Sequence, residues 1–305
     1  MVDHNSGSST PLDTAWLRGH PLPRPAHDVD KNTRGHVLVL GGSLQVPGGI
    51  RLTGEAALRS GAGKVRIGTV ASAVQSLGAL FPEAGFLALP ESPDGEVNAD
   101  RELLEGHLAR CDCVVVGPAM ACGNHASRLL DSVLDGMRGK GKGSDALVID
   151  ASALMTLGRH ADVLRSRSSP SVITPHIGEM AAMLECESQD IARDRLAAAR
   201  EAARRFYAVV VLKGSTTLVA EPAGTHFLYS GGNAGLATGG SGDVLAGIAG
   251  GLLARGCPPL EAALWSVWLH GEAGRICAEG IGRLGFLARD LLITLPRVMQ
   301  SAGEA

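Results

Sequence analysis

The feature that most constrains the fold of this 305-residue chain is a series of short apolar runs that alternate with helical stretches. Most of the runs are rich in Val, Ile and Leu at consecutive positions, which is typical of strands buried on both faces. They are residues 36–40, 64–69, 85–89, 112–116, 146–150, 171–174 and 208–212. Buried strands that alternate with helices predict an α/β fold, a three-layer sandwich with a mostly parallel central sheet and helices on both faces.

The connecting segments fit this architecture. A helix is expected from about Ile50 to Ser60, and another from about 188 to 206, where Ile191, Ala199 and Phe206 share one helical face. Residues 216–221 and 225–230, with Pro222-Ala223-Gly224 between them, predict a hairpin.

The rest of the chain predicts one domain. From Val244 it is expected to be helical to the end, apart from loops near 256–259 and 280–285. Neither an internal repeat nor a linker is evident, so residues 36–300 are predicted to form a single catalytic domain. Residues 1–35 are polar and contain four prolines, which predicts a mostly irregular lead-in with a short helix near Trp16.

Charge and composition exclude several classes of protein. Lys and Arg total 28 against 31 Asp and Glu, so no basic excess indicates binding to nucleic acid or to an anionic membrane. The N-terminus lacks the apolar region of a signal peptide, and no apolar stretch is long enough to span a membrane. The six cysteines lack metal-ligand spacing, which indicates reduced thiols. We therefore expect a cytoplasmic protein.

The most informative segment is GGNAGLATGGSGDVLAG at residues 231–247. Glycines at 239, 240 and 242 allow several backbone N–H groups to converge, and the helix expected to begin near Asp243 adds its positive end. Such a site stabilises a phosphoryl group in transfer, and Asp243 could accept a proton from an attacking hydroxyl beside it. The alternative is a glycine loop with Asp243 as an ordinary N-cap.

Two further segments carry polar side chains at the ends of predicted strands. In VVVLKGSTT, residues 209–217, Lys213 and the hydroxyls after it suit phosphate or ribose oxygens. In VITPHIGEM, residues 172–180, Pro175 ends the strand and presents His176 and Glu179. Ligands of open α/β sheets bind at the carboxyl ends of the strands, so both segments are candidates for the same site. Alone, each also fits an exposed turn or a helix cap.

One apparent motif is set aside. GMRGKGK at residues 136–142 nearly spells a phosphate-binding P-loop, but Gly143 stands where Ser or Thr is required, and a strand follows instead of a helix. The chain also lacks HExxH, GxSxG and zinc-ligand spacing.

These segments together resemble the ribokinase-like superfamily and, within it, the ADP-dependent NAD(P)H-hydrate dehydratase family. The resemblance runs from about residue 28 to 297. It implies an enzyme, a hydro-lyase that dehydrates the S-epimer of hydrated NADH or NADPH at the expense of ADP, giving NAD(P)H, AMP and phosphate. It is carried in order by GHVLVLGGS, AALRSGAGKV, VVVGPAM, LVIDASAL, TPHIGEM, VVVLKGSTT, GNAGLATGGSGDVLAG and FLARDLLITLP.

The resemblance also implies the roles of individual residues. Asp243 is the implied catalytic base, and Glu179 is the implied ligand of Mg²⁺, through water. Contacts to the hydrated nicotinamide nucleotide are implied for Gly49, Gly117, His176 and Asp243. Contacts to ADP and AMP are implied for Lys213, Gly214, Ser215, Thr216, Thr217 and Gly242.

The chain departs from the family pattern at four places. Gly49 stands where relatives often have alanine, and GPAM at 117–120 lacks a further glycine that they usually show. Ser241 replaces the commoner threonine, and Ser152 stands where relatives often have a second aspartate after Asp150.

Other readings remain open at this point. A small-molecule kinase of the hydroxymethylpyrimidine or hydroxyethylthiazole kinase type would use the same Asp243 but release a stable phosphorylated product. A catalytically silent nucleotide-binding module is the second alternative. The preference for ADP over ATP, a homotetrameric state and a separate epimerase acting on the same substrate pool come from the resemblance alone.

Overall fold

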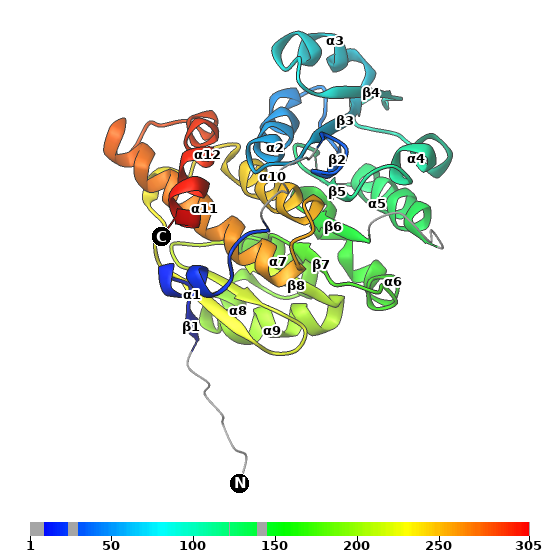
Figure 1. The fold of residues 1–305 in the computed structure, drawn as a ribbon. Coiled ribbons are helices and arrows are strands. Elements are labelled where there is room, and N and C mark those ends of the chain that lie inside the picture. The colour runs from blue at the N-terminus through cyan, green and yellow to red at the C-terminus, as the bar shows by residue number, and fades with distance from the viewer. Residues whose placement is uncertain (1–8, 24–29, 122, 139–144, 305) are drawn as a thin grey trace.

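The computed structural model describes residues 9–23, 30–121, 123–138 and 145–304. Ten strands in these residues form one sheet in the order β1-β10-β9-β8-β7-β6-β5-β2-β3-β4 (Figure 1). They are β1 (Thr10–Pro11), β2 (His36–Leu40), β3 (Lys64–Val70), β4 (Gly85–Leu89), β5 (Cys113–Val116), β6 (Ala146–Ile149), β7 (Ser171–Ile173), β8 (Ala208–Leu212), β9 (Thr217–Ala220) and β10 (His226–Tyr229).

The strands run mostly parallel. All neighbours from β4 to β8 pair in parallel, and β9 is antiparallel to both β8 and β10. Their side chains are largely buried; β5 and β8, for example, are buried throughout. This confirms the predicted mostly parallel sheet, because strands covered on both faces need apolar residues at consecutive positions.

Helices cover the sheet. They are α1 (Thr14–Gly19), α2 (Pro47–Arg59), α3 (Ala71–Leu80), α4 (Arg101–Leu108), α5 (Asn124–Met137), α6 (Ala161–Arg165), α7 (Ile177–Leu184), α8 (Ser188–Arg193), α9 (Arg195–Phe206), α10 (Ser241–Ala254), α11 (Pro259–Gly280) and α12 (Ala288–Glu304), with the 3₁₀ helices η1 (Ala151–His160) and η2 (Ala234–Leu236). One group comprises α2, α10, α11 and α12, and a second group includes α4, α5, η1, α6, α7 and α9.

The direction of the crossovers places the binding edge. From β2 the chain proceeds to β3 and β4 on one side, and from β5 to β6, β7 and β8 on the other. Because parallel crossovers are right-handed, the two series put their helices on opposite faces of the sheet. The direction reverses between β2 and β5, and in open α/β sheets this switch point is where ligands bind.

Two local expectations differ from the structure. The helix expected over 188–206 is two helices, broken at Asp194, whose carboxylate accepts a hydrogen bond from the N–H of Ala197 (2.9 Å) and so begins α9. The short helix near Trp16 is present as α1, and the strand β1 before it was not expected. The Trp16 ring lies edge-on to Phe227 of β10 (5.7 Å), so residues 10–19 pack on the sheet.

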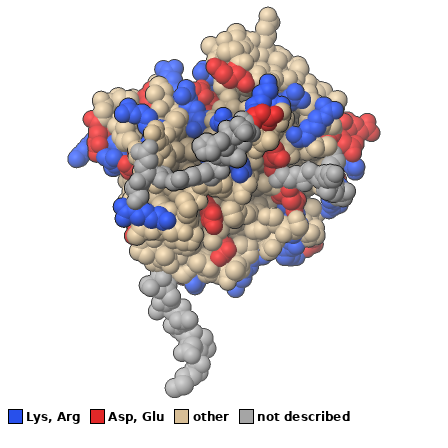
Figure 2. Space-filling model, in the orientation of Figure 1, with Lys and Arg blue, Asp and Glu red and all other residues tan. Residues whose placement is uncertain are grey.

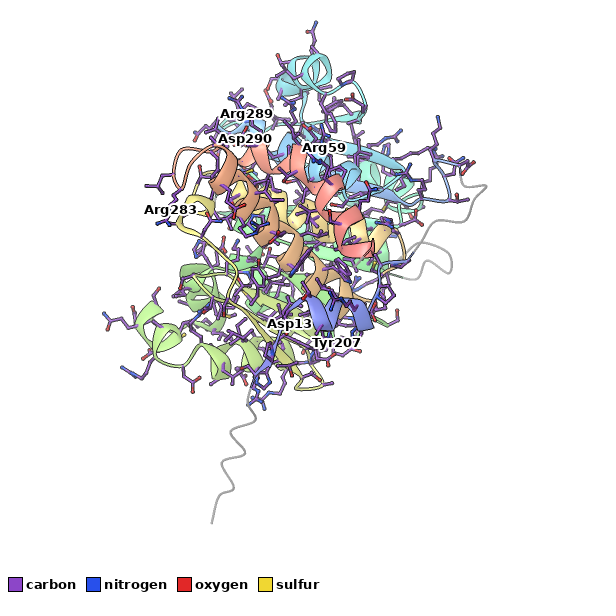
Figure 3. The ribbon with its side chains drawn as sticks, turned by 60° about the vertical axis from the view of Figure 1, so that its left-hand side comes forward. Asp13, Arg59, Tyr207, Arg283, Arg289 and Asp290 are labelled. Carbon is purple, nitrogen blue, oxygen red and sulfur yellow. The ribbon has the colours of Figure 1, made fainter. Side chains whose placement is uncertain are left out.

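Capping explains where two terminal helices begin. Asp13 accepts a hydrogen bond from the N–H of Trp16 (2.9 Å) at the start of α1, and Asp290 accepts one from the N–H of Leu287 (2.7 Å) at the start of α12. Both caps are labelled in Figure 3, where Asp290 lies above Asp13. Side-chain caps of this kind satisfy backbone donors that a helix leaves unpaired.

The charged side chains on the surface agree with the near-neutral composition. Basic and acidic side chains are interspersed on the face seen in Figure 2. Within the described ranges, no helix combines the length and apolar character needed to cross a membrane. The P-loop-like segment at 136–142 extends into residues 139–144, which lie outside the described part of the chain.

Candidate active site

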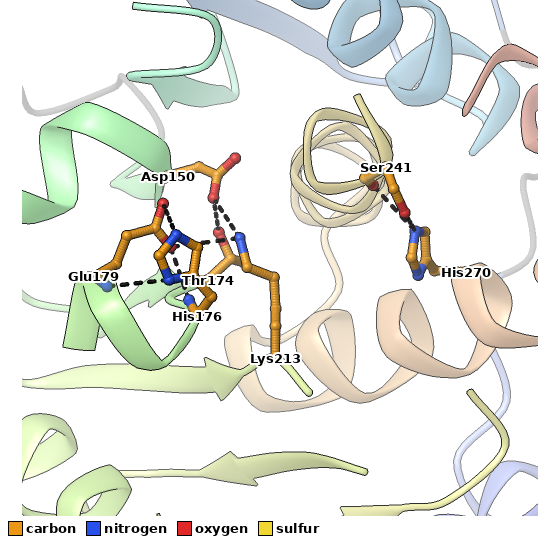
Figure 4. Close-up of polar contacts among 7 residues, drawn as sticks. All are labelled: Asp150, Thr174, His176, Glu179, Lys213, Ser241 and His270. Carbon is orange, nitrogen blue, oxygen red and sulfur yellow. Dashed lines mark hydrogen bonds and ion pairs between the residues drawn. The ribbon is translucent and has the colours of Figure 1, made fainter. Parts of the chain in front are cut away.

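Three neighbouring parallel strands end in polar side chains that meet at one edge of the sheet. Asp150 follows β6, Thr174 follows β7 and Lys213 follows β8. The Thr174 hydroxyl donates a hydrogen bond to Asp150 Oδ1 (2.6 Å), and Lys213 Nζ lies 3.4 Å from the same oxygen (Figure 4). The order β6-β7-β8 therefore brings together groups that are far apart in the sequence.

Lys213 also pairs with Glu179, the third residue of α7. Its Nζ lies 3.6 Å from Glu179 Oε2, and both carboxylates that it contacts are nearly inaccessible to solvent. Burial by itself would lower the pKa of Lys213, but the carboxylates of Asp150 and Glu179 outweigh it and raise that pKa above its ordinary value. Lys213 therefore carries a positive charge and lies between two buried carboxylates.

His176 and Glu179 form a reciprocal cap at the start of α7. The N–H of Glu179 donates to His176 Nδ1 (3.1 Å), and the N–H of His176 donates to Glu179 Oε2 (2.7 Å). Because Nδ1 accepts, the neutral ring carries its proton on Nε2. The His176 side chain is 59% exposed, which leaves the ring open to a ligand although its backbone is fixed.

Asp243 lies in the first turn of α10. The N-cap is Gly240, with φ 87°, and Asp243 is the third helical residue. The alternative that Asp243 is an ordinary N-cap is therefore wrong. A side chain at Gly240 would come within 2.5 Å of Leu52, so both conformation and space require glycine there. The N–H of Ser241 donates to the Thr238 carbonyl oxygen (3.2 Å), whereas those of Gly242 and Asp243 have no partner within the described chain.

The environment of Asp243 makes its carboxylate hard to ionise. Burial, followed by the nearby negative charge of Asp150, raises the pKa of Asp243 from 3.8 to about 7, and Lys213 offsets part of this rise. Among the described residues, its carboxylate makes no hydrogen bond or ion pair. A carboxylate whose pKa lies near neutral pH can gain and lose a proton under ordinary conditions.

The two glycines predicted to contact substrate lie at the switch point. Gly49, in α2, lies so close to Asp243 that an added Cβ would be 3.0 Å from Oδ2. Gly117 follows β5 with φ 106°, and an added Cβ would be 2.1 Å from the carbonyl oxygen of Asp150. Gly49 therefore approaches the Asp243 carboxylate, and Gly117 approaches the backbone of Asp150, without a side chain between them.

A cavity of about 700 Å³ opens beside these groups. The predicted residues His176, Lys213, Gly214, Ser215, Thr217 and Gly242 line it. Gly49, Gly117, Glu179, Thr216 and Asp243 are not part of its lining. For Thr216 the reason is a different contact, because its hydroxyl accepts a hydrogen bond from Arg195 Nη1 (3.1 Å).

Several lining residues were not predicted from the sequence. His270 of α11 lies with Nε2 2.9 Å from Ser241 Oγ and 3.0 Å from the Ser241 carbonyl oxygen (Figure 4). Burial lowers the pKa of His270 to about 4, so the ring is neutral at ordinary pH. An apolar part of the wall is formed by Tyr229, Leu236, Leu245 and Val267. These residues reach the cavity from several elements, so no local sequence pattern predicts them. Asp150 could have been predicted as a site residue, because it follows a buried strand directly.

The chemistry available here is phosphoryl transfer. The cavity is large enough for a nucleotide, and its lining combines apolar side chains with the Lys213 cation. Free N–H groups at the start of α10 can stabilise an anion, and Asp243 can accept a proton beside them.

A metal ion could be held by few protein groups. The described residues contain no group of three or more His, Cys, Asp or Glu side chains placed to hold a metal. Mg²⁺ is commonly held by one or two carboxylates together with water and substrate phosphates, and Asp150 and Glu179 offer two buried carboxylates near the cavity. The donor set therefore fits a Mg²⁺ that arrives with a nucleotide.

The fold and site define the class of protein, and comparison with known proteins defines the family. A family model described as NAD(P)H-hydrate dehydratase matches residues 37–297. A curated protein of Xanthomonas campestris pv. campestris, named ADP-dependent (S)-NAD(P)H-hydrate dehydratase, is 40% identical over 293 residues, which are 94% of this chain and 95% of that one. The chain belongs to the NAD(P)H-hydrate dehydratase family.

Solved structures agree. The ADP/ATP-dependent NAD(P)H-hydrate dehydratase of Bacillus subtilis, co-crystallised with ATP and Mg²⁺, is similar with a TM-score of 0.80 and 29% identity, over 97% of this chain and all of that one. A ribokinase-like superfamily protein of Enterococcus faecalis has a TM-score of 0.81 and 27% identity, over 97% of each chain. The fold is therefore ribokinase-like, as the sequence predicted.

Proposed function

We propose that this protein is an ADP-dependent (S)-NAD(P)H-hydrate dehydratase, which converts the S-epimer of hydrated NADH or NADPH to NAD(P)H while ADP is split into AMP and phosphate. The observation that carries the proposal is the Asp243 carboxylate, whose pKa is raised to about 7 beside the helix start and the cavity. The family assignment and the ADP-dependent relatives support the choice of substrate.

The proposed reaction begins at Asp243. Its carboxylate removes the proton from the hydroxyl at C6 of the hydrated nicotinamide ring, and the oxygen forms a bond to the β-phosphorus of ADP. The bond from the β-phosphorus to the bridging oxygen breaks, and AMP leaves. The C6–O bond then breaks to release phosphate, and the neighbouring C5 gives up a proton to solvent, which restores the C5–C6 double bond of NAD(P)H. The N–H groups of Gly240 and Gly242 would stabilise charge on the phosphoryl group.

The substrate is proposed to enter from the switch point. The hydrated nicotinamide would lie beside Asp243, where Gly49 and Gly117 bring their backbones close to Asp243 and Asp150, and the exposed His176 ring offers a donor on Nε2. These three contacts are proposals that the close packing around Asp243 supports.

The nucleotide is proposed to fill the cavity. Lys213 and the loop Gly214, Ser215 and Thr217 would contact its phosphates or ribose, and the apolar wall would accept the base. Gly242 lies beside Lys213, since a Cβ there would be 3.4 Å from Nζ, so both contacts can serve one ligand. Thr216 would act through Arg195 and not by direct contact.

Mg²⁺ is the proposed metal. When bound, it would neutralise phosphate charge, and Glu179 would hold it through water, with Asp150 close by. A homotetrameric state, a separate epimerase and a cytoplasmic location remain predictions from the sequence.

The test is to incubate the protein with the separated epimers of hydrated NADH, ADP or ATP, and Mg²⁺. Recovery of reduced-ring absorbance from the S-epimer, with equal amounts of AMP and phosphate when ADP is used, is the expected result. The weaker alternative, a small-molecule kinase, would accumulate a stable phosphorylated product. If neither the S-epimer is consumed nor ADP split, the proposed function is wrong.

A further inference from the structure

Arg195 lies behind the predicted nucleotide loop. It is the first residue of α9, directly after the break at Asp194. Its Nη2 donates to the carbonyl oxygens of Thr216 (2.8 Å), Leu212 (3.1 Å) and Lys213 (3.5 Å), and its Nη1 donates to the Thr216 hydroxyl (3.1 Å). One guanidinium therefore holds both sides of the loop that joins β8 to β9.

The charge of Arg195 is not paired with any acid in the described part of the chain. No ion pair to any described carboxylate is found for Arg195, whereas Arg193 and Arg204 on either side of it pair with Asp190 and Glu201. Its Nε is buried without a partner, and burial lowers the pKa of its guanidinium. A cation in the first turn of a helix is also disfavoured by the helix dipole. The position is thus electrostatically costly for an arginine that only fills space.

The contacts of Arg195 determine where the loop points its donors. In a trans peptide the carbonyl group and the following N–H point in opposite directions. Because the carbonyl of Lys213 faces Arg195, the N–H of Gly214 points away from it, and Gly214 lines the cavity. The carbonyl of Thr216 also faces Arg195, at the point where Thr217 begins β9 and pairs with Tyr229. A Cβ at Gly214 would lie 2.7 Å from Nη2, which explains why glycine occupies that position.

We propose that Arg195 is a positioning residue for the nucleotide: it orients the Lys213–Thr217 loop from behind, and the phosphates of the bound nucleotide balance its charge. The proposal rests on the proposed function for the identity of that nucleotide as ADP. Lys213 is paired with Asp150 and Glu179, whereas Arg195 contacts only carbonyl and hydroxyl oxygens, so the anionic ligand is the group that would offset its charge. An arginine is suited to this role, because its planar fork reaches two acceptors at once and a lysine does not.

The test measures ADP binding directly, by calorimetry, and then steady-state kinetics, for the full chain carrying Arg195→Ala or Arg195→Lys. We expect the dissociation constant and the KM for ADP to rise at least about tenfold in both variants. At saturating ADP, kcat should stay within about threefold of the parent, and the KM for the hydrated dinucleotide should not change. The matched control is Arg200→Ala, on the same helix, whose Nη2 lies near His226 Nδ1 (3.3 Å) and away from the loop; it should bind ADP normally.

A second measurement isolates the charge. Binding of adenosine, AMP and ADP should be weakened progressively more in Arg195→Ala as phosphates are added, since only the phosphates balance the guanidinium. Equal weakening for all three ligands would overturn the proposed charge balance. Unchanged ADP binding, or equal loss of affinity for both substrates, would overturn the positioning role. Because binding is the readout, a protein that binds ADP but does not dehydrate the hydrate would refute the proposed function and leave this test intact.

Discussion

The candidate site has two regions that contain carboxylates, and the regions differ in whether a cation pairs with the carboxylates. In one, Asp150 and Glu179 are buried, and Lys213 contacts both of them. In the other, Asp243 makes no such pair within the described chain, and burial raises its pKa to about 7. The comparison teaches that a single sheet edge can hold a cluster in which a cation pairs with two carboxylates, suited to binding, beside a carboxylate free to exchange a proton, suited to catalysis.

The substitution Asp243→Asn is the strongest test of the catalytic role assigned to the unpaired carboxylate. The variant keeps the size of the side chain but removes the base, so turnover should fall by roughly 10²–10⁴-fold. Binding of ADP should persist, because Asp243 is not part of the cavity lining. Steady-state rates and an ADP titration check both parts. Glu261→Gln, which changes another first-turn carboxylate, in α11, is the control and should retain full activity. Turnover within tenfold of the parent would remove Asp243 from the role of base.

The pH profile tests the same difference without a substitution. Asp243 must be ionised to act as a base, so kcat/KM should be flat above pH about 7 and fall by about tenfold per unit below it. A profile that falls only below pH 5 would show that the carboxylate is as easily ionised as an exposed one.

Stability should change with pH in the opposite direction. The folded-state pKa of Asp243 is raised above its unfolded value of 3.8, so the folded protein holds this proton more tightly. The stability that this contributes is complete below pH about 4 and is lost as pH rises to about 7, by at most about 1.4 kcal/mol per unit. Asp243→Asn lacks this loss. The melting temperature of the variant, relative to that of the parent, should therefore rise between pH about 4 and pH about 7. Above pH about 7 the difference between the two should stay constant.

In the balanced region, the test is Lys213→Met. Removal of the cation leaves two buried carboxylates without a partner, which should cost about 3 kcal/mol of unfolding free energy. It should also move the acid limb of the rate profile upward, because Lys213 lowers the pKa of Asp243. Urea denaturation and the rate profile measure the two effects. Lys64→Met, at an exposed hydrogen bond to Asn32, should be close to neutral. If Lys213→Met matches that control, the cluster is not electrostatically coupled.

The sequence predicted those parts of the molecule that depend on local pattern. Strands such as β8 are recognisable because every residue in them is apolar, and Lys213 and His176 follow strand ends. The features that the sequence did not predict depend on tertiary contacts. The two residues of β1 form a strand because β10 is beside them, and His270 reaches the cavity from the middle of a long helix. The break at Asp194 was hidden by an apolar spacing that continues through it.

One departure from the family pattern now has a physical explanation. An added Cβ at Gly49 would lie 2.7 Å from the Cβ of Ala119, and no real pair of such atoms comes so close. Ala119 itself adopts φ 57°, a left-handed conformation that costs an alanine roughly 1 kcal/mol. The structure therefore accommodates a methyl group at 119 or at 49, and not at both without a shift.

This coupling gives the smallest predicted effect and the finest test of the Asp243 region. Gly49→Ala should push the loop at 119 or the Asp243 carboxylate aside and lower kcat/KM by about tenfold, since small displacements of reacting groups are costly. Ala119→Gly alone should change kcat/KM little, because it removes a methyl group and relieves strain. The double variant should recover most of the activity that Gly49→Ala loses, with the remaining deficit due to the 3.0 Å approach to Asp243 Oδ2. A double-mutant cycle on kcat/KM measures this coupling. Purely additive effects would show that Ala119 does not limit the space beside Asp243, and that the carboxylate alone sets the requirement for glycine at 49.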